Sequence, residues 1–209
     1  MTQSKKGISA LQIQRIIGSG SYRTAWYMCH RIRAAMQSPE FKKLTGVVEV
    51  DETYIGGKAK NRHGGGVGHG KKMYEGGRGT AGKLIVVGAI ARKGNVVAKL
   101  IQNTDEKTLK GFVRSVVSEK VKLVASDEHE GYQRLGLPHA SVRHGRKEYV
   151  RGNVHTANID SFWALLKRGI VGTFHKVSRD YLPFYLNEFS FRYNHRKDGN
   201  MFALVVAGS

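Results

Sequence analysis

The stretch 155-HTANIDSFWALLKRGIVG-172 decides how the rest of the chain is interpreted. Its apolar residues recur at helical spacing, which predicts a helix buried along one stripe formed by Ile159, Phe162, Trp163, Leu166 and Ile170. At about 100° per residue, Asp160 and Lys167 point almost the same way, on one border of that stripe. The helix therefore holds a carboxylate and an ammonium side by side at the edge of the core. A surface ion pair at helical spacing is the alternative that this helix leaves open.

The charge balance points to a polyanionic partner. The 209 residues include 35 Lys and Arg against 16 Asp and Glu, a formal net charge of +19. Such an excess favours nucleic acid, with a membrane surface as the weaker alternative. The sequence has neither a long apolar run nor the apolar core of a signal peptide, which indicates a cytoplasmic protein without a membrane anchor. The single Cys29 excludes a disulfide framework and a multi-cysteine zinc site within this chain.

Residues 1–40 are expected to form a small helical DNA-binding segment. Helical patterns at 9–17 and 22–36 are separated by the sequence GSGS. Two short helices joined by a Gly-containing turn resemble a helix-turn-helix, with an ordinary αα-hairpin as the alternative. The second helix has a buried stripe through Ala25, Cys29, Ile32 and Met36. Three basic residues lie away from this stripe or at its edge: Arg23, Arg31 and Arg33. Of these, Arg23 is a predicted DNA contact.

Residues 41–209 have the pattern of an α/β domain. Strands are predicted at 46–55, 83–92, 96–101, 122–126 and 141–144. Thr104 is expected to cap a helix that starts at 105, and Ser178 a last helix that ends near Tyr193. Hairpin strands, a crossover helix and a strand that ends in an acid predict a mixed sheet flanked by helices.

Two basic segments interrupt this domain. Residues 56–82 are rich in Gly, Lys, Arg and His and have few apolar residues, so a loop that neutralises DNA phosphates is predicted. A second basic loop precedes the helix at 155. The DNA contacts assigned to these segments and their borders are Lys58, Arg78, Lys83, Arg146 and Lys147.

Three acids are the candidate catalytic and metal-binding residues. Asp51 lies near the exit of the first strand, Asp127 directly follows the fourth, and Asp160 lies in the first turn of the helix. Clustered carboxylates repel one another, so their joint presence is best explained by divalent cations between them. Two Mg²⁺ (or Mn²⁺) ions about 3.5–4 Å apart serve phosphodiester chemistry. Three unrelated surface acids are the alternative that spacing alone leaves open.

Asp51 has an acidic neighbour in sequence. Glu52 directly follows it, and successive side chains of a strand face opposite sides. Only one of the two is therefore expected to join a given site.

Several motifs in order resemble one family. VEVDETYIGGK, GRGTAGK, SDEHEGY and HTANIDSFWALLKRGIVGTFHKVS are similar to the catalytic domain of bacterial insertion-sequence DDE transposases, in the ISXO-like branch. The helical pair GISALQIQRIIGSGSYRTAW is part of this resemblance, which covers about residues 6–196. The resemblance implies an RNase H-like fold, a DDE metal site and DNA cleavage and strand transfer at transposon ends. It also implies a homo-oligomer on DNA, in the bacterial nucleoid.

The resemblance assigns roles by position. Asp51, Asp127 and Asp160 match the first, second and third acids of the DDE motif. Lys167 matches the basic residue seven positions after the third acid, and with Arg168 it is an expected contact to end DNA. The usual third acid of the family is Glu, and Asp160 is shorter by one methylene. Relatives usually begin with a cysteine-rich zinc ribbon, and this sequence starts just short of the helix-turn-helix, so the expectation is a fragment or a decayed copy with an incomplete N-terminal segment.

The expected reaction is attack on a phosphodiester by water and then by a DNA 3′-hydroxyl. A transposase remnant that only binds DNA is the alternative from another class, and a nuclease that cuts without joining is a third. Tyr54 and Tyr132 lie close to acids, but the Arg-His-Arg partners of a tyrosine recombinase are not evident.

Overall fold

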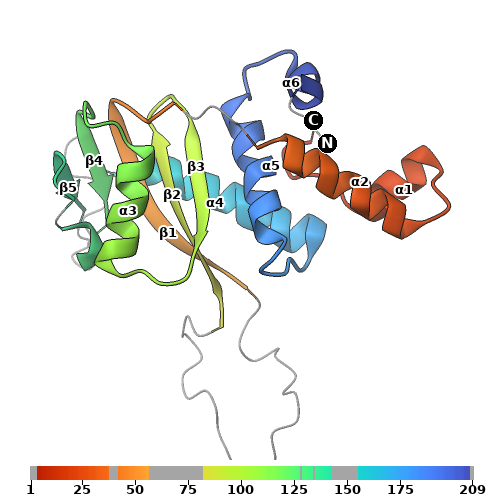
Figure 1. The fold of residues 1–209 in the computed structure, drawn as a ribbon, viewed down its shortest axis with the longest axis horizontal. Helices are drawn as coiled ribbons and strands as arrows, with labels where there is room; N and C mark the ends of the chain where they lie inside the picture. The colour runs from red at the N-terminus through yellow and green to blue at the C-terminus, as the bar shows by residue number, and fades with distance from the viewer. Residues whose placement is uncertain are drawn as a thin grey trace, which may run out of the picture.

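The computed structural model describes residues 4–37, 42–56, 82–127, 129–133, 135–142 and 155–207. A sheet with helices on both faces forms one part, and a helical hairpin projects from one end of it (Figure 1). The strands are β1 (Val47–Ile55), β2 (Leu84–Ala91), β3 (Val96–Ile101), β4 (Leu123–Ser126) and β5 (His139–Ser141). The helices are α1 (Ala10–Ile17), α2 (Tyr22–Ala35), α3 (Glu106–Val116), α4 (Ala157–Gly169), α5 (Leu182–Asn194) and α6 (Met201–Ala207). None of these helices is both long and apolar enough to cross a lipid bilayer.

The sheet places β1 at its centre. The strand order is β3-β2-β1-β4-β5. β2 pairs antiparallel with both β1 and β3, whereas β4 pairs parallel with both β1 and β5. The connection from β3 to β4 runs through α3 and crosses the sheet, because β2 and β1 lie between these two strands. The prediction of an α/β fold, with a mixed sheet flanked by helices and preceded by a small helical segment, is confirmed.

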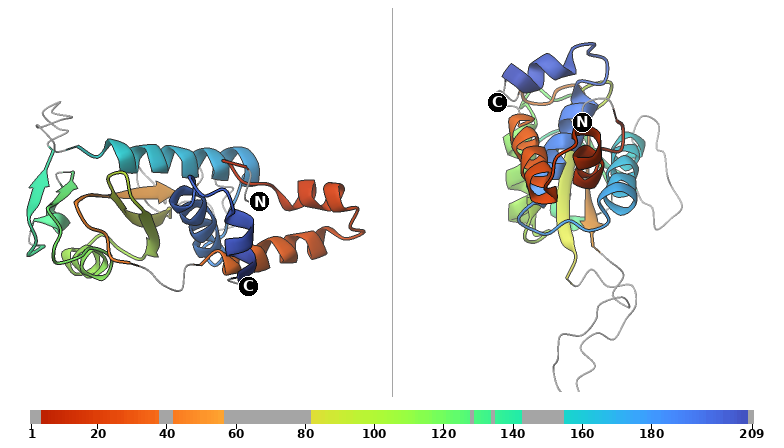
Figure 2. Two further views of the ribbon diagram at one scale, coloured as in Figure 1. Left: turned by 90° about the horizontal axis from the view of Figure 1, so that it is seen from above. Right: turned by 90° about the vertical axis from the view of Figure 1, so that its right-hand side faces the viewer.

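Each face of the sheet has its own core. Alternating residues of a strand point to opposite faces. Val48, Val50, Val87 and Ala89 pack with the apolar side of α3 on one face. On the other face, α4 and α5 cover Val86 and Ile90 (Figures 1 and 2). The apolar stripe predicted for residues 155–172 is buried here, which fixes α4 across the sheet.

Three local predictions need correction. Asp105 caps α3 in place of Thr104, because its carboxylate accepts the backbone N–H of Thr108 at 2.7 Å. The helix predicted to be the last, α5, begins at Leu182 without a side-chain cap, so Ser178 does not cap it, and the further helix α6 follows it. The fifth strand spans His139–Ser141 and so begins two residues before the predicted 141–144, of which residues 143 and 144 lie outside the described part of the chain.

The N-terminal helices form a hairpin. α1 and α2 lie side by side and project from the domain (Figure 2), and Gly18 ends α1 in the left-handed conformation at φ 67°. Arg33, predicted at the edge of the stripe, is 2% exposed because α5 packs over this side of α2. Its Nε lies 2.7 Å from Oε2 of Glu188. Recognition of DNA by this hairpin as a helix-turn-helix stays a prediction.

Candidate metal centre

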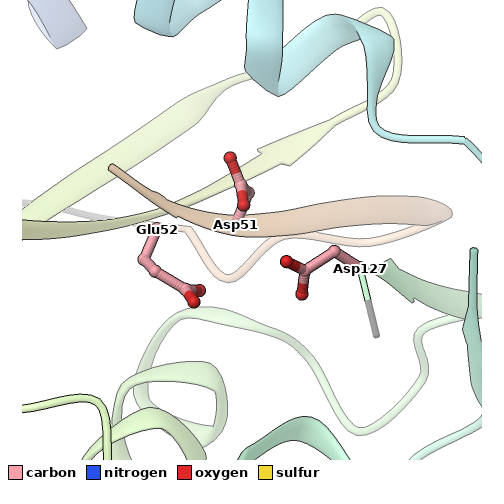
Figure 3. A group of neighbouring side chains, drawn as sticks. All are labelled: Asp51, Glu52 and Asp127. Carbon is pink, nitrogen blue, oxygen red and sulfur yellow. The ribbon is translucent and has the colours of Figure 1, made fainter. Parts of the chain in front are cut away.

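The site forms where β1 extends beyond β4. The two strands pair from Val47 to Glu49, so Asp51 and Glu52 lie past the last paired residue. Asp127 directly follows the end of β4. One carboxylate oxygen from each of Asp51, Glu52 and Asp127 lies within 4.8 Å of the other two (Figure 3). Two of the three predicted acids, far apart in sequence, are thus brought together.

The expectation that only one of Asp51 and Glu52 could join the site is wrong. Their side chains do leave β1 on opposite sides (Figure 3). However, β4 has ended at this level, and Asp127 lies within reach of both carboxylates beside the strand. The alternation rule assigns side chains to faces of a fully paired strand, and it does not separate them where the neighbouring strand stops.

Each acid has a hydrogen-bond donor that orients it. The indole Nε1 of Trp163 donates to Oδ2 of Asp51 at 2.8 Å. The hydroxyl of Tyr132 donates to Oε2 of Glu52 at 2.7 Å, and this tyrosine is fully buried. The backbone N–H of His129 donates to Oδ1 of Asp127 at 3.1 Å. The carboxylates are therefore held by groups of α4 and of the turn after β4.

Burial and the charges of neighbouring acids make Asp51 and Glu52 hold protons unusually well. Burial raises the pKa of Asp51 to about 7, with further increases from the charges of Glu52 and Asp127, while the Trp163 hydrogen bond opposes the shift. Burial likewise raises the pKa of Glu52, against the effect of the Tyr132 hydrogen bond. A divalent cation between the acids would relieve both costs. Three oxygen donors in this arrangement fit Mg²⁺ or Mn²⁺.

Asp160 stands apart from this group. It is exposed in the first turn of α4 and accepts a hydrogen bond from Oγ1 of Thr156 at 3.3 Å. It is not among the three acids whose oxygens lie within 4.8 Å, although its charge contributes to the raised pKa of Asp51. Among the described residues no ion pair joins it to Lys167, so the simple surface pair is not formed. Its role as the third acid stays a prediction.

The predicted DNA contacts are only partly described. Lys167, Arg168 and Arg23 are exposed, and Lys83 is half-buried. The remaining ones lie outside the described residues: Lys58, Arg78, Arg146 and Lys147. Contact of any of these side chains with DNA stays a prediction.

Sequence reasoning missed the most heavily bonded carboxylate near the site. Glu49 is fully buried and accepts hydrogen bonds from Asn158, Ile159 and Arg92. Strand periodicity could have identified it, because residues 49 and 51 of one strand share a face. An acid at this position of an apolar strand has to find donors inside the protein.

Comparisons with known proteins found a matching family, a related sequence and a solved chain with limited structural similarity. The sequence model of the ISXO2-like transposase domain family matches residues 43–194. A Halobacterium salinarum protein, described as an uncharacterized protein in transposable element ISH50, is 28% identical over 180 residues, which is 82% of this chain. The alignment spans 60% of the length of that relative. A solved chain of the simian T-cell lymphotropic virus intasome, in complex with the PP2A regulatory subunit B56 gamma, is 11% identical with a TM-score of 0.40, covering 88% of this chain and 67% of that one.

Proposed function

The chain belongs to the family of ISXO2-like transposase domains, and from this premise we propose that it is a DNA transposase with a divalent-metal site. It cleaves the ends of its element and transfers them into target DNA. The observation that carries the proposal is the approach of Asp51 and Asp127, 76 positions apart by 127 − 51, to within 4.8 Å at the end of β4. Unrelated surface acids have no reason to converge in a chain with a net charge of +19.

We assign the metal ligands to Asp51, Asp127 and Asp160, with Glu52 as an additional carboxylate. Asp160 lies on α4 on the same side of the sheet as Trp163, which contacts Asp51. Two Mg²⁺ or Mn²⁺ ions, when bound, supply Lewis acidity for phosphodiester attack and departure. Among the chain's own groups, Trp163 fixes Oδ2 of Asp51 and Tyr132 fixes Oε2 of Glu52.

The partner is DNA. The excess of basic residues suits the phosphate backbone, and the predicted contacts at Lys167 and Arg168 lie on the helix that carries Asp160. Action as a homo-oligomer on DNA, in the cytoplasm at the nucleoid, belongs to the same proposal. If six to ten phosphates are contacted, affinity is expected to fall about 10³–10⁵-fold between 50 and 200 mM salt.

A DNA-binding remnant without catalysis is the second candidate. The exposed position of Asp160, outside the group of close carboxylates, favours it. Both candidates predict the same salt dependence, so affinity for DNA does not separate them. Only the transposase requires metal-dependent nicking.

The test is an assay of the purified chain on its element's end DNA with Mg²⁺, Mn²⁺ or EDTA. We expect nicking with either metal and none with EDTA or after Asp127→Asn. Glu130→Gln, which removes an exposed acid three residues away, is the matched control and should cut normally. Pre-cleaved ends test joining separately, and nicking without joined product would identify a nuclease instead. Absence of metal-dependent nicking in the unsubstituted chain would leave the DNA-binding remnant.

A further inference from the structure

We infer that Glu49 is a positioning residue: its buried carboxylate fixes the first turn of α4 against β1 and so sets where Asp160 lies relative to Asp51. The inference rests on the proposed function, since Asp160 matters only if that site holds cations. It assigns Glu49 no contact with metal or DNA.

Glu49 caps the N-terminus of α4 from strand β1, because the residue at the N-cap position does not. The first N–H groups of a helix have no partner within the helix, and a carboxylate there also interacts favourably with the helix dipole. Thr156, at the N-cap position of α4, makes no capping hydrogen bond with its side chain and instead donates to Asp160. Oε2 of Glu49 accepts the backbone N–H groups of Asn158 at 2.8 Å and Ile159 at 3.2 Å.

The second carboxylate oxygen of Glu49 makes further contacts to α4 and to the residue after β2. Oε1 accepts Nδ2 of Asn158 at 2.7 Å and Nε of Arg92 at 2.8 Å, and Nδ1 of His155 lies 3.3 Å away. The side chain is fully buried, so these bonds are not exchanged with water. A single carboxylate thereby ties the end of β2 and the start of α4 to β1.

β1 holds α4 at a second point, two residues further along the same face. Asp51 accepts Nε1 of Trp163, which lies one helical turn after Ile159. Asp160 lies between the two attachments. Loosening the first attachment frees the turn that carries Asp160, while Trp163 keeps the rest of the helix in place.

A purely structural role for Glu49 makes a different prediction. An ion pair between Glu49 and Arg92 that only stabilised the fold would affect global unfolding when broken. If Glu49 positions α4, its substitution also accelerates hydrogen exchange at the first backbone amides of α4 and lowers the affinity of the site for metal ions. Glu188 offers a matched control, because it is another fully buried carboxylate, paired with Arg33 on α2, away from the site.

The experiment uses Glu49→Gln in the full chain. The amide oxygen can still accept the backbone N–H groups, but its NH₂ then faces the donors of Asn158 and Arg92. We expect hydrogen exchange at Asn158 and Ile159 to accelerate at least about tenfold. We expect the affinity for Mn²⁺ alone, followed by electron paramagnetic resonance without DNA, to fall about tenfold, as for other supporting residues around metal ligands. Glu188→Gln should change neither, whatever it does to the melting temperature.

A second substitution that restores the hydrogen bond tests the inference in the opposite direction. Adding Asn158→Asp to Glu49→Gln places an acceptor opposite the new amide and keeps the net charge of the pair, so exchange protection and Mn²⁺ affinity should largely return. If Glu49→Gln does not fold, Asn158→Ala removes one hydrogen bond to Glu49 and should shift both readouts less, in the same direction. Unchanged exchange at Asn158 and Ile159, or a loss of Mn²⁺ affinity no greater than in Glu188→Gln, would overturn the inference. Failure of the unsubstituted chain to bind Mn²⁺ would instead count against the proposed function, and the exchange arm would still decide the role of Glu49.

Discussion

Asp51 combines burial with three acidic neighbours and one hydrogen bond to an indole. Its pKa of about 7 means that a proton and a divalent cation compete for the same carboxylate near neutral pH. Because the cation has to displace the proton, its apparent affinity should rise about tenfold per pH unit below 7 and level off above it. Titrating Mn²⁺ at several pH values measures this. An affinity that is flat between pH 5 and about 7 would contradict a raised pKa.

The same residue makes the metal-free protein less stable as pH rises. The pKa of Asp51 is raised from 3.8 to about 7 on folding, so between these values the folded state binds more protons than the unfolded state. The contribution of Asp51 to the free energy of unfolding should therefore fall as pH increases from about 4 to about 7, then stay constant. Thermal unfolding in EDTA measures the fall, and Asp51→Asn should reduce it. Burial lowers the pKa of His30 to about 4, which contributes the opposite slope in both proteins. The same pH dependence in Asp51→Asn and in the unsubstituted protein would therefore show that the carboxylate is not buried as described.

The sequence pattern places Asp51 on the first strand and Asp127 directly after the fourth, and the resemblance to DDE transposases selects these two acids from their acidic neighbours. Glu52 was not predictable in the same way, since its place in the group depends on where β4 ends beside β1. The donors that orient these acids were also hidden from sequence. Tyr132 and Trp163 come from segments 80 and 112 positions away from the carboxylates that they contact.

At the level of elements, the contact between β2 and α4 is unusually close. Gly88 pairs with Asp51, and a Cβ added at Gly88 would lie 2.6 Å from Cη2 of Trp163. Gly88→Ala should push the indole away from Asp51 and lower the free energy of unfolding by about 1–3 kcal/mol, the usual cost of overpacking. Urea denaturation measures the change.

Gly111→Ala is the control for that substitution. Gly111 lies within α3, and apart from its chain neighbours and its own helix backbone no described atom lies within 4 Å of its added Cβ. Alanine should therefore be neutral or stabilise by up to about 1 kcal/mol. Equal stability of Gly88→Ala and the unsubstituted protein would mean that Trp163 does not pack against β2 as described.

The strands were predictable to within a residue or two where they are long and apolar, as β2 and β3 are. The first residues of the helices were less predictable than the strand boundaries. Capping depends on which of several adjacent side chains reaches the free N–H groups, and the cap of α4 comes from Glu49, 109 positions earlier. Local sequence does not contain that information.

On the scale of the whole molecule, the helical hairpin is joined to the α/β domain by a buried charge network. Arg33 of α2 pairs with Glu188 of α5 at 2.7 Å, and Arg192 lies 3.5 Å from the other oxygen of Glu188. The guanidinium of Arg33 also stacks 4.1 Å from the ring centre of Tyr185. Sequence reasoning assigned Arg33 to the edge of a stripe, because its partner lies 155 positions away.

Breaking this network should destabilise the protein strongly. Arg33→Met leaves Glu188 buried with Arg192 alone, and loss of one partner of a buried pair costs about 3–5 kcal/mol. Chemical denaturation measures the loss, with the exposed Arg31→Met as the control on the same helix. A loss below about 1 kcal/mol, the range of exposed pairs, would mean that α2 and α5 are not packed as described.

The most direct test of the metal site is strand transfer of pre-cleaved end DNA in Mg²⁺ by Asp51→Asn, beside the unsubstituted protein. The substitution keeps the shape of the side chain and removes its negative charge from the cluster formed by Asp51, Glu52 and Asp127. We expect salt-sensitive DNA binding to persist and joined product to disappear. Joined product at the unsubstituted rate would show that the carboxylates at the end of β4 do not carry the reaction.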